Sequence, residues 1–558
     1  MKLTGAQLIV GMLERQGVRV IAGLPGGAVL PLYDALGASR TIAHVLARHE
    51  QGAAFMAQGY ARVTGEAGVC LASSGPGATN LVTAIADADL DSIPLVCITG
   101  QVPRAMIGTD AFQEVDICSL VAPVVKRCWQ AKSAAELLDI VPEAFRIALS
   151  GRPGPVLIDV PKDVQVESGE IERLPEPGRA TPAPVADARG IEQAAALINA
   201  SQRPILYLGG GVIQSGAGGL ALALAEKASL PTVLTLMALG AIPADHPLCL
   251  GMLGMHAARH TNLALEECDL LIAVGARFDD RATGKLAEFC PKAKVIHVDI
   301  DARELGRLKR ADVAIAADAA AALRALSDSV EVRPRIGWLS RVADLKRDFP
   351  LQMERADDVL SHYGLVRAVA ELSPEDAVIA TDVGQHQMWV AQAYPFAEPR
   401  TWLTSGGLGT MGFGMPAAMG AALAARVRGE SRRVICFSGD GSLLMNIQEL
   451  ATIAEEGLDV KIVLMNNNAL GLVHQQQAMF YGKRQFASSY RVAPDFARIA
   501  EGFGVRAVDL DDAADPRAAL ASALATPGAC LIHVSIDAAQ HVLPMVPPGA
   551  ANREMIAS

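Results

Sequence analysis

The chain repeatedly places a short, continuous apolar run in front of a glycine-rich turn or a helical stretch. In the first third, these runs span residues 18–24, 45–47, 69–73, 95–99 and 156–160. Apolar runs of this length, without alternation of polar and apolar positions, are typical of parallel strands that are buried on both faces. The pattern predicts an α/β fold built from doubly wound parallel sheets.

The same pattern recurs twice further along the chain. The later runs span residues 204–208, 232–235, 270–274 and 295–299, and then residues 378–381, 434–437, 461–465 and 530–535. Between the groups lie a Pro-, Glu- and Ala-rich linker and a charged, irregular segment. We therefore expect three domains, in residues 1–165, 189–332 and 361–558, joined by linkers at residues 166–188 and 333–360; the 558-residue length agrees, at roughly 100 to 200 residues per domain.

Composition and charge exclude several classes of protein. With 51% hydrophobic and 20% charged residues the chain is globular, and a net charge of -11 argues against nucleic acid as a partner. The uncharged stretch 401–425 contains too many glycines and polar residues for a membrane span, and suits a ligand-binding loop. No secretory signal is evident, and the nine cysteines form no CxxC pair. We expect a cytoplasmic protein with reduced cysteines and neither disulfide nor zinc.

The strongest local signal lies in the third domain. Asp440 follows an apolar run within Gly-Asp-Gly, and Asn467 follows the next run within Asn-Asn. The carboxyl ends of parallel strands share one edge of a sheet, so these two side chains can converge there. A carboxylate and an amide oxygen suit Mg²⁺, and the glycines let backbone amides approach a phosphate. The alternative is an ordinary turn followed by a strand cap.

This pair resembles the metal-binding motif of thiamine-diphosphate-dependent enzymes, and the resemblance covers the whole chain. It implies that Glu50, in Arg48-His49-Glu50, faces the aminopyrimidine ring of the cofactor and exchanges a proton with its N1′ atom, a task for a general acid–base carboxyl. By itself, Glu50 is also explained as an acidic residue favoured by the dipole in the first turn of a helix.

Longer motifs narrow the resemblance to acetohydroxyacid synthases, also called acetolactate synthases. They are SGPGATN at residues 74–80, GTDAFQE at 108–114, GARFDDR at 275–281, DVGQHQMW at 382–389 and PMVPPGA at 544–550. The family condenses two 2-ketoacids with thiamine diphosphate, Mg²⁺ and FAD. The resemblance therefore implies three thiamine-diphosphate-enzyme domains, pyruvate and 2-ketobutyrate as substrates, and the first common step of branched-chain amino-acid synthesis.

The resemblance also assigns roles residue by residue. It implies catalytic roles for Glu50, Phe112, Gln113, Lys126 and Arg277, the last pairing with a ketoacid carboxylate, a geometry that suits the planar guanidinium. For thiamine diphosphate it implies Glu50, Pro25, Gly26, Gln385, His386, Gly409, Met411, Asp440, Gly441, Ser442 and Asn467, and for Mg²⁺ it implies Asp440, Asn467 and the carbonyl of Ala469. For FAD it implies Arg152, Gly210, Gly211, Met255, His256, Gly275, Arg277, Asp279, Arg281, Asp299, Ile300 and Asp318.

The predicted acceptor pocket, at Met252, His474 and Gln476, departs from most of the family. Relatives usually carry Arg in place of His474 and Trp in place of Gln476, and that tryptophan favours 2-ketobutyrate over pyruvate. The version found here resembles the enterobacterial isozyme I type. We therefore expect little preference for 2-ketobutyrate.

Two other readings remain open. The first is a related decarboxylase, pyruvate oxidase or other carboligase, which would share the fold. The second is a catalytically silent subunit that binds FAD or serves in assembly. The resemblance further implies a homodimer or homotetramer, because the family forms its cofactor site from the first domain of one subunit and the third domain of another. It also implies a separate small regulatory subunit.

Overall fold

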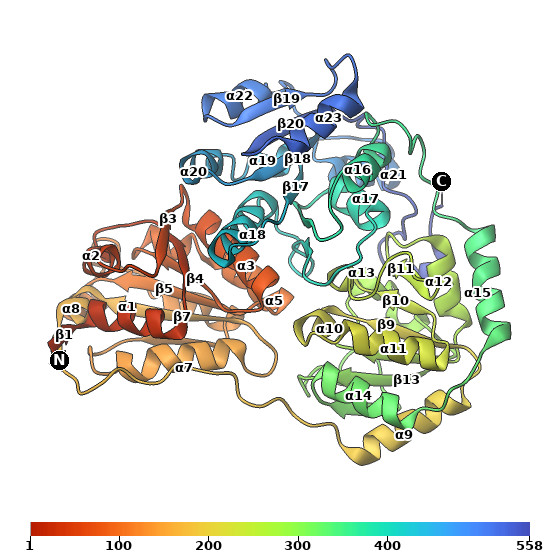
Figure 1. The fold of residues 1–558 in the computed structure, drawn as a ribbon, viewed down its shortest axis with the longest axis horizontal. Coiled ribbons are helices and arrows are strands. Elements are labelled where there is room, and N and C mark those ends of the chain that lie inside the picture. The colour runs from red at the N-terminus through yellow and green to blue at the C-terminus, as the bar shows by residue number, and fades with distance from the viewer. Residues whose placement is uncertain (1, 558) are drawn as a thin grey trace.

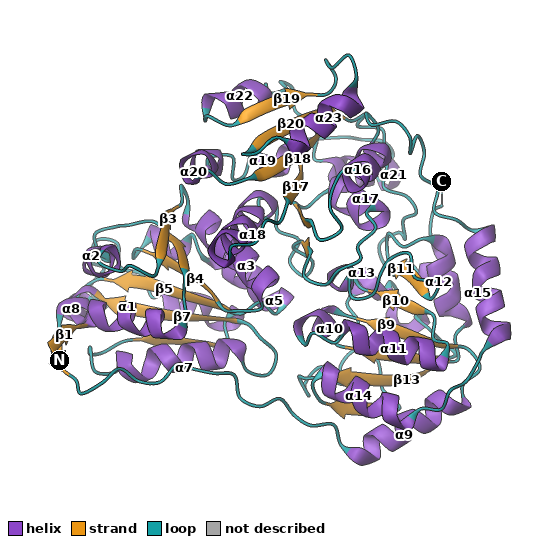
Figure 2. Cartoon of the chain, viewed as in Figure 1, coloured by secondary structure: helices purple, strands orange, loops and turns teal. Residues whose placement is uncertain are grey.

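The computed structural model describes residues 2–557 as three lobes that follow one another along the chain (Figure 1). Each lobe contains a six-stranded sheet whose neighbouring strands all run parallel, with helices on both sides (Figure 2). The predicted α/β class, with three doubly wound parallel sheets, is confirmed. The domain boundaries themselves remain predictions.

The first sheet has the strand order β3-β2-β4-β5-β7-β6. Its strands are β2 Val20–Gly23, β3 Ala43–Leu46, β4 Gly68–Ala72, β5 Leu95–Gln101, β6 Arg127–Gln130 and β7 Pro155–Pro161. The helices are α1 Gly5–Gln16, α2 Leu30–Gly37, α3 Glu50–Thr64, α4 Pro76–Thr79, α5 Val82–Asp91, α6 Ile117–Val121, α7 Leu137–Leu149 and α8 Lys162–Val166. A short antiparallel pair, β1 Lys2–Thr4 with β8 Ser168–Glu170, lies beside this sheet.

The second sheet has the order β11-β10-β9-β12-β13-β14. Its strands are β9 Pro204–Leu208, β10 Thr232–Leu234, β11 Cys249–Met252, β12 Leu270–Val274, β13 Lys294–Asp299 and β14 Val313–Ala316. The helices are α9 Ala188–Ala200, α10 Gly210–Gln214, α11 Gly218–Ala228, α12 Arg259–Glu267, α13 Asp280–Thr283 and α14 Ala319–Ser329.

The third sheet has the order β16-β15-β17-β18-β20-β19. Its strands are β15 Val378–Thr381, β16 Trp402–Leu403, β17 Val434–Gly439, β18 Val460–Asn466, β19 Arg506–Asp509 and β20 Cys530–Ser535. The helices are α16 His362–Glu371, α17 Gln385–Ala393, α18 Gly414–Arg428, α19 Asp440–Leu443, α20 Glu449–Glu456, α21 Gly471–Phe480, α22 Phe496–Gly502 and α23 Pro516–Ala525.

Helices α3 and α18 join the first and third lobes by close backbone packing. A Cβ atom on Gly59 of α3 would lie 2.0 Å from the carbonyl oxygen of Ala417, and one on Gly420 of α18 would lie 2.0 Å from that of Met56. No side chain fits at such a distance, so both positions require glycine. Their apolar faces share one hydrophobic core that includes Phe55 and Phe413.

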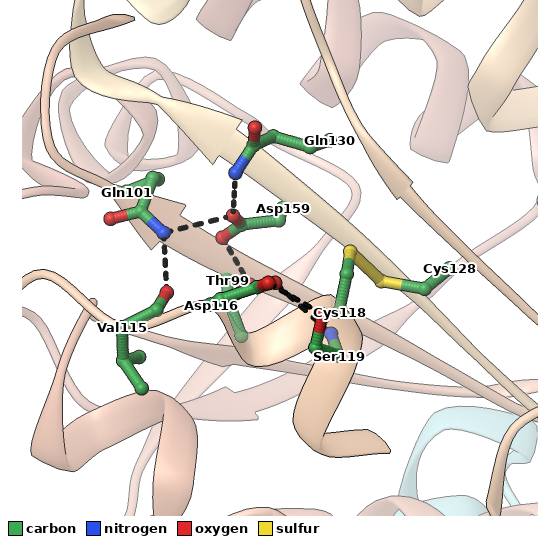
Figure 3. Close-up of a disulfide and its surroundings, with 9 residues drawn as sticks. All are labelled: Thr99, Gln101, Val115, Asp116, Cys118, Ser119, Cys128, Gln130 and Asp159. Atoms are coloured by element: carbon green, nitrogen blue, oxygen red, sulfur yellow. Dashed lines mark hydrogen bonds between the residues drawn. A yellow bond between two sulfur atoms is a disulfide. The ribbon is translucent and has the colours of Figure 1, made fainter. Parts of the chain in front are cut away.

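Two expectations from the sequence are wrong. The segment predicted to be irregular contains helix α15 Ile336–Asp348, which packs on the second lobe through its buried residues Trp338, Val342 and Leu345. The cysteines are not all reduced, because Cys118 and Cys128 form a disulfide, whereas the other seven are buried thiols (Figure 3). A ten-residue separation does not reveal such a pair without the positions of α6 and β6.

Residues 401–425 contain strand β16, a loop and most of helix α18. Within residues 2–557, no helix has the length and apolar character that crossing a bilayer demands. Residues 414–425 of this stretch belong to α18, whose apolar side chains are buried against α3.

Candidate active site

In each of the three sheets, the chain leaves two neighbouring strands toward opposite edges of the sheet. These pairs of strands are β2 and β4, β9 and β12, and β15 and β17. Loops that leave the carboxyl ends of two such strands diverge and open a crevice, the usual ligand site of an open parallel sheet. Residues predicted from the sequence follow these strands: Pro25 and Gly26; Gly210, Gly211 and Gly275; and Gln385, His386, Asp440 and Gly441.

Glu50 lies in a compact cluster at the first of these crevices. It is the first residue of α3, and its Oε2 accepts a hydrogen bond from Asn80 Nδ2 at 2.8 Å. Its Oε1 faces Gly77, where a Cβ atom would lie 3.2 Å away. Gly26 packs tightly against Ser73, because a Cβ atom on this glycine would lie 2.4 Å from Ser73 Oγ. The loops after β2 and β4 therefore meet beside the Glu50 carboxyl.

Gln113 and Phe112 lie on the loop between β5 and α6. A Cβ on Gly75 would lie 2.9 Å from the Cα of Gln113, so this loop reaches the neighbourhood of the Glu50 cluster. Gln113 has a left-handed backbone with φ 62°, and the Phe112 side chain is 87% exposed. In the single chain, Phe112 is therefore largely exposed to solvent.

Asp440 and the turn after β18 converge at the third crevice. The buried Asp440 lies close to the backbone N–H groups of Asn468 and Ala469, yet its Oδ2 has no hydrogen-bond partner in the described chain. Burial raises the pKa of this carboxyl to about 6. Asn467 Oδ1 accepts from the Ala469 N–H at 3.1 Å, and Asn467 Nδ2 donates to Gln385 Oε1 at 2.9 Å.

His386 lies buried beside this pair. Burial lowers the pKa of its imidazole to about 3, so the ring is neutral, and its Nε2 has no partner among residues 2–557. A Cβ on Gly439 would lie 3.0 Å from His386 Nδ1, and one on Gly384 would lie 2.8 Å from its Cε1. The two glycines therefore make room for the ring.

The donor set of this crevice fits Mg²⁺ and a diphosphate. A buried carboxylate oxygen without a partner, an amide oxygen and a backbone carbonyl of the neighbouring turn are oxygen ligands of the kind that Mg²⁺ takes. An unpartnered imidazole nitrogen can donate to a phosphate oxygen. Gly439 and Gly441 flank Asp440 at the start of α19, and the end of a helix that carries its N–H groups favours an anion.

The loop with Gly409 and Met411 is fastened by two aspartates that the sequence analysis did not single out. Asp382, after β15, accepts from the N–H of Gly412 at 2.7 Å and of Gly414 at 3.2 Å. Asp87, on α5 of the first lobe, accepts from Thr410 Oγ1 at 2.9 Å. The loop is thereby held from both the first and the third lobe.

A cavity of about 780 Å³ opens at the β9–β12 crevice of the second lobe. All twelve residues predicted to bind FAD line it, together with Met252, Gly409 and Gln476. Two glycine-containing loops that line the cavity lie in close contact with each other. Gly275 has φ +60°, and a Cβ there would lie 2.7 Å from the Cα of Gly211. Backbone can approach a ligand closely at both positions.

Two arginines that line this cavity, Arg152 and Arg277, differ in their hydrogen-bond partners. Arg152 is held by Ser92 Oγ at 2.8 Å and by Glu304 Oε1 at 3.3 Å. Arg277 is different, because within residues 2–557 its guanidinium makes no hydrogen bond. The half-buried Arg277 is therefore free to pair with an anionic ligand.

Comparison with known proteins decides the family. Three domain families match the chain: the thiamine pyrophosphate enzyme N-terminal TPP binding domain at residues 3–120, the central domain at residues 191–326, and the C-terminal TPP binding domain at residues 382–534. The acetolactate synthase isozyme 1 large subunit of Escherichia coli is 59% identical over 100% of this chain and 98% of its own. The chain belongs to the acetolactate synthase family.

Other acetolactate synthases extend this similarity. The isozyme 2 large subunit of Escherichia coli is 46% identical over 99% of both chains. Acetolactate synthase 1 of Zea mays, a chloroplastic protein, is 44% identical over 99% of this chain and 88% of its own. The chain is thus an enzyme of acetolactate synthase type, with thiamine diphosphate, Mg²⁺ and FAD as its cofactors.

Two residues predicted from the acetolactate synthase resemblance lie apart from these clusters. Lys126 Nζ donates to the carbonyl oxygens of Ile147 and of Ser150 at the end of α7. His474 does not line the cavity, because it hydrogen-bonds to Gln485 at 2.8 Å and to Ser489 at 3.2 Å at the surface. The structure therefore gives both side chains partners outside the cavity.

Several residues that support the site were missed. Asn80, Asp382 and the buried Gln475 all hold predicted residues or their loops. Gln475 Oε1 accepts from Gln385 Nε2 at 3.0 Å and from the Val542 N–H at 2.8 Å, so it ties α17 to the C-terminal segment. Asn80 and Asp382 lie within motifs quoted from the sequence, and Gln475 lies between the predicted His474 and Gln476, but the partner of each is remote in sequence and is visible only in the fold.

Proposed function

We propose that the chain decarboxylates pyruvate and joins the resulting two-carbon unit to a second pyruvate, giving 2-acetolactate, or to 2-ketobutyrate. The observation that carries this proposal is the unpaired Arg277, which lines the same cavity as Gly409 and Gln476. A guanidinium that makes no hydrogen bond to residues 2–557, in the same cavity as the loop with Gly409 and Met411, can hold the carboxylate of an acceptor ketoacid. A simple decarboxylase needs no such group for a second ketoacid.

The roles of the site residues are part of the proposal. When bound, thiamine diphosphate supplies the carbanion chemistry that breaks and forms the bond next to the ketoacid carbonyl. Glu50, fixed by Asn80, would hold a proton at its carboxyl oxygen opposite the aminopyrimidine nitrogen. Asp440, Asn467 and the Ala469 carbonyl would hold Mg²⁺, and the neutral His386 would meet the diphosphate.

In this proposal, a charged side chain binds the acceptor substrate and neighbouring side chains exclude water from it. Arg277 would fix the acceptor carboxylate, and orientation of two bound reactants lowers the barrier to their reaction. Phe112 and Gln113 would cover the reacting atoms once a neighbouring subunit completes the cleft. Met252 and Gln476 would line the side-chain end of the acceptor, and His474 would act only as a support of that region.

The same proposal covers assembly and location. The relatives are named large subunits, which supports a small regulatory partner, and we propose a homodimer or homotetramer as the active form. Domains at residues 1–165, 189–332 and 361–558 would provide the pyrimidine, FAD and diphosphate sites. The proposed location is the cytoplasm, and cell fractionation tests it.

Product analysis tests the reaction. The enzyme, loaded with thiamine diphosphate, Mg²⁺ and FAD, is incubated with pyruvate alone, and the products are separated and quantified. Acetolactate as the main product supports the proposal. Acetaldehyde or acetyl phosphate as the main product would instead show a decarboxylase or an oxidase.

A further inference from the structure

The loop that carries Phe112 and Gln113 is anchored where it joins α6. Gln101 Nε2, at the end of β5, donates to the Val115 carbonyl at 2.7 Å and to Asp159 Oδ2 at 3.1 Å. Asp116 caps α6 by accepting from the Ser119 N–H at 3.0 Å. The Gln101 contacts connect the end of the loop to β5 and β7, and the Asp116 contact connects it to the first turn of α6.

The Cys118–Cys128 disulfide adds a covalent tie at the same place. Cys118 lies in α6, directly after the loop, and Cys128 lies in β6, the strand at the edge of the first sheet (Figure 3). Gln130 of the same strand donates to Asp159 Oδ2 at 3.1 Å, so β6 also reaches the polar cluster that holds the loop. The disulfide therefore couples α6, and through it the loop, to the edge strand.

The location of this pair differs from that of every other cysteine. Cys118 and Cys128 are half-buried, whereas the remaining seven cysteines are buried free thiols. An external thiol must reach a sulfur atom to exchange with it, and a half-buried disulfide between a short helix and an edge strand allows such an approach. Disulfides in proteins of reducing compartments are mostly transient or redox-sensing.

We propose that Cys118 and Cys128 form a thiol–disulfide exchange site that controls how firmly the Phe112–Gln113 loop is held. In the closing direction, the two thiols reduce one molecule of a low-molecular-weight disulfide, such as glutathione disulfide. The Cys118–Cys128 bond forms, the S–S bond of the oxidant breaks, and two molecules of the free thiol leave with the two protons. The inference rests on the proposed function for its effect on turnover, but not for the exchange itself.

The physical consequence concerns order in the loop. Without the disulfide, α6 is held by the buried side chains of Ile117 and Val121 and by its Asp116 cap. Removing a cross-link increases the number of conformations open to the linked segment. We expect the reduced enzyme to position the second ketoacid less well, which raises its KM severalfold and leaves its fold intact.

The test uses the holoenzyme equilibrated with glutathione and glutathione disulfide over a range of ratios. Differential alkylation and peptide mass mapping report the state of Cys118 and Cys128, hydrogen exchange reports protection of residues 102–116, and product formation reports KM. We expect all three to change together with one midpoint. The variants Cys118→Ser, Cys128→Ser and the double variant should match the reduced enzyme and show no dependence on the glutathione ratio.

Three results would overturn the proposal. They are two free thiols at every glutathione ratio, loop protection that is the same in both redox states, and a redox response that persists in the double variant. Thiol mapping and hydrogen exchange require no turnover. An enzyme that passes both and makes no acetolactate therefore contradicts the proposed function and leaves the exchange site in place.

Discussion

At the scale of single residues, the site contains two kinds of polar side chain. Some are held in place by a hydrogen-bond partner, and others keep a polar atom that has no partner in the described part of the chain. Glu50 is oriented by Asn80; among residues 2–557, Asp440 and His386 each keep a buried atom without a hydrogen-bond partner, and the Arg277 guanidinium makes no hydrogen bond. Unpartnered buried polar atoms are costly, so they persist where a ligand satisfies them. Three predictions concern individual side chains.

Replacing Glu50 with Gln should leave the fold intact and reduce turnover by about 100-fold or more, because the amide cannot exchange a proton. Acetolactate formation by the variant, together with its melting temperature, checks this. Glu66→Gln is a suitable control, since Glu66 is a surface residue that bonds Tyr60 and Arg428 and should be dispensable for activity. Retention of more than half of the activity by Glu50→Gln would remove Glu50 from the mechanism.

Gln476→Trp should restore an apolar wall to the acceptor pocket. The distinction between pyruvate and 2-ketobutyrate is one methylene, so the preference for 2-ketobutyrate should rise by about 10- to 100-fold. Competition between the two acceptors measures it. Gln476→Ala is the control and should raise the preference little; an equal effect of both substitutions would show that removal of the amide, not the new ring, is responsible.

Asp159 should make stability depend on pH. Burial raises the pKa of its carboxyl from 3.8 to about 6, so between these values the native state holds a proton that the unfolded chain has lost. Stability therefore falls as the pH rises from about 4 to about 6, by up to about 3 kcal/mol, and is level above. Melting temperatures of the wild type and Asp159→Asn across this range should differ in slope, and parallel curves would contradict the assignment.

At the scale of helices and strands, the cofactor loops are placed by backbone contacts that only glycine allows. Helices α3 and α18 approach until the Cα atoms of Gly59 and Gly420 face opposing carbonyls, and this packing sets the first lobe against the third. The Arg62 guanidinium of α3 adds a buried ion pair, at 2.8 Å from Asp91 Oδ2 of α5. Asp91 also accepts from the Gly407 N–H, which belongs to the cofactor loop.

Gly420→Ala should destabilise this helix pair strongly. Its Cβ would lie 2.0 Å from the Met56 carbonyl oxygen, so the helices must separate, at a cost of about 1 to 3 kcal/mol or more. The melting temperature should fall and the protein should need more thiamine diphosphate for half-maximal activity. Gly219→Ala in α11, where nothing lies within 4 Å, should leave both values unchanged; an unaffected Gly420→Ala enzyme would contradict the packing argument.

At the scale of the whole molecule, the proposed site draws on separate lobes. Glu50 begins α3 of the first lobe and Asp440 begins α19 of the third, and the large cavity is lined by residues of all three lobes. The three lobes follow one another along the chain (Figure 1). The exposed Phe112 beside Gln113 also points to a surface that a second chain would cover. If each site is formed by the first lobe of one subunit and the third lobe of the other, it contains Glu50 of one chain and Asp440 of the other.

Mixing two inactive variants tests that arrangement. Equal amounts of Glu50→Gln and Asp440→Asn subunits, dissociated and reassembled together, should recover about a quarter of wild-type activity, since each mixed dimer regains one intact site. Acetolactate formation before and after mixing measures the recovery. Each variant taken alone through the same treatment is the control, and no recovery in a confirmed mixed dimer would place both residues of a site in one chain.

Interior strands were predictable, whereas most edge strands were not. Runs such as 204–208, 270–274 and 530–535 coincide with β9, β12 and β20, because a strand buried on both faces must be apolar throughout. Strands β6, β11, β14, β16 and β19, each at the edge of its sheet, were missed. Strands β6 and β19 carry charged residues at their ends, whereas β11, β14 and β16 are apolar runs of only four, four and two residues, too short to be recognised by pattern alone.

The sequence by itself determined the fold class, the family and the residues at each strand end, because these follow from local patterns and contiguous motifs. Only the tertiary structure decided which of those residues meet. It brought the predicted FAD residues into one cavity, left Lys126 and His474 with other partners, formed helix α15 and joined Cys118 to Cys128. The physical reason is that burial, partnering and cross-linking depend on contacts between segments remote in sequence, and no local pattern records them.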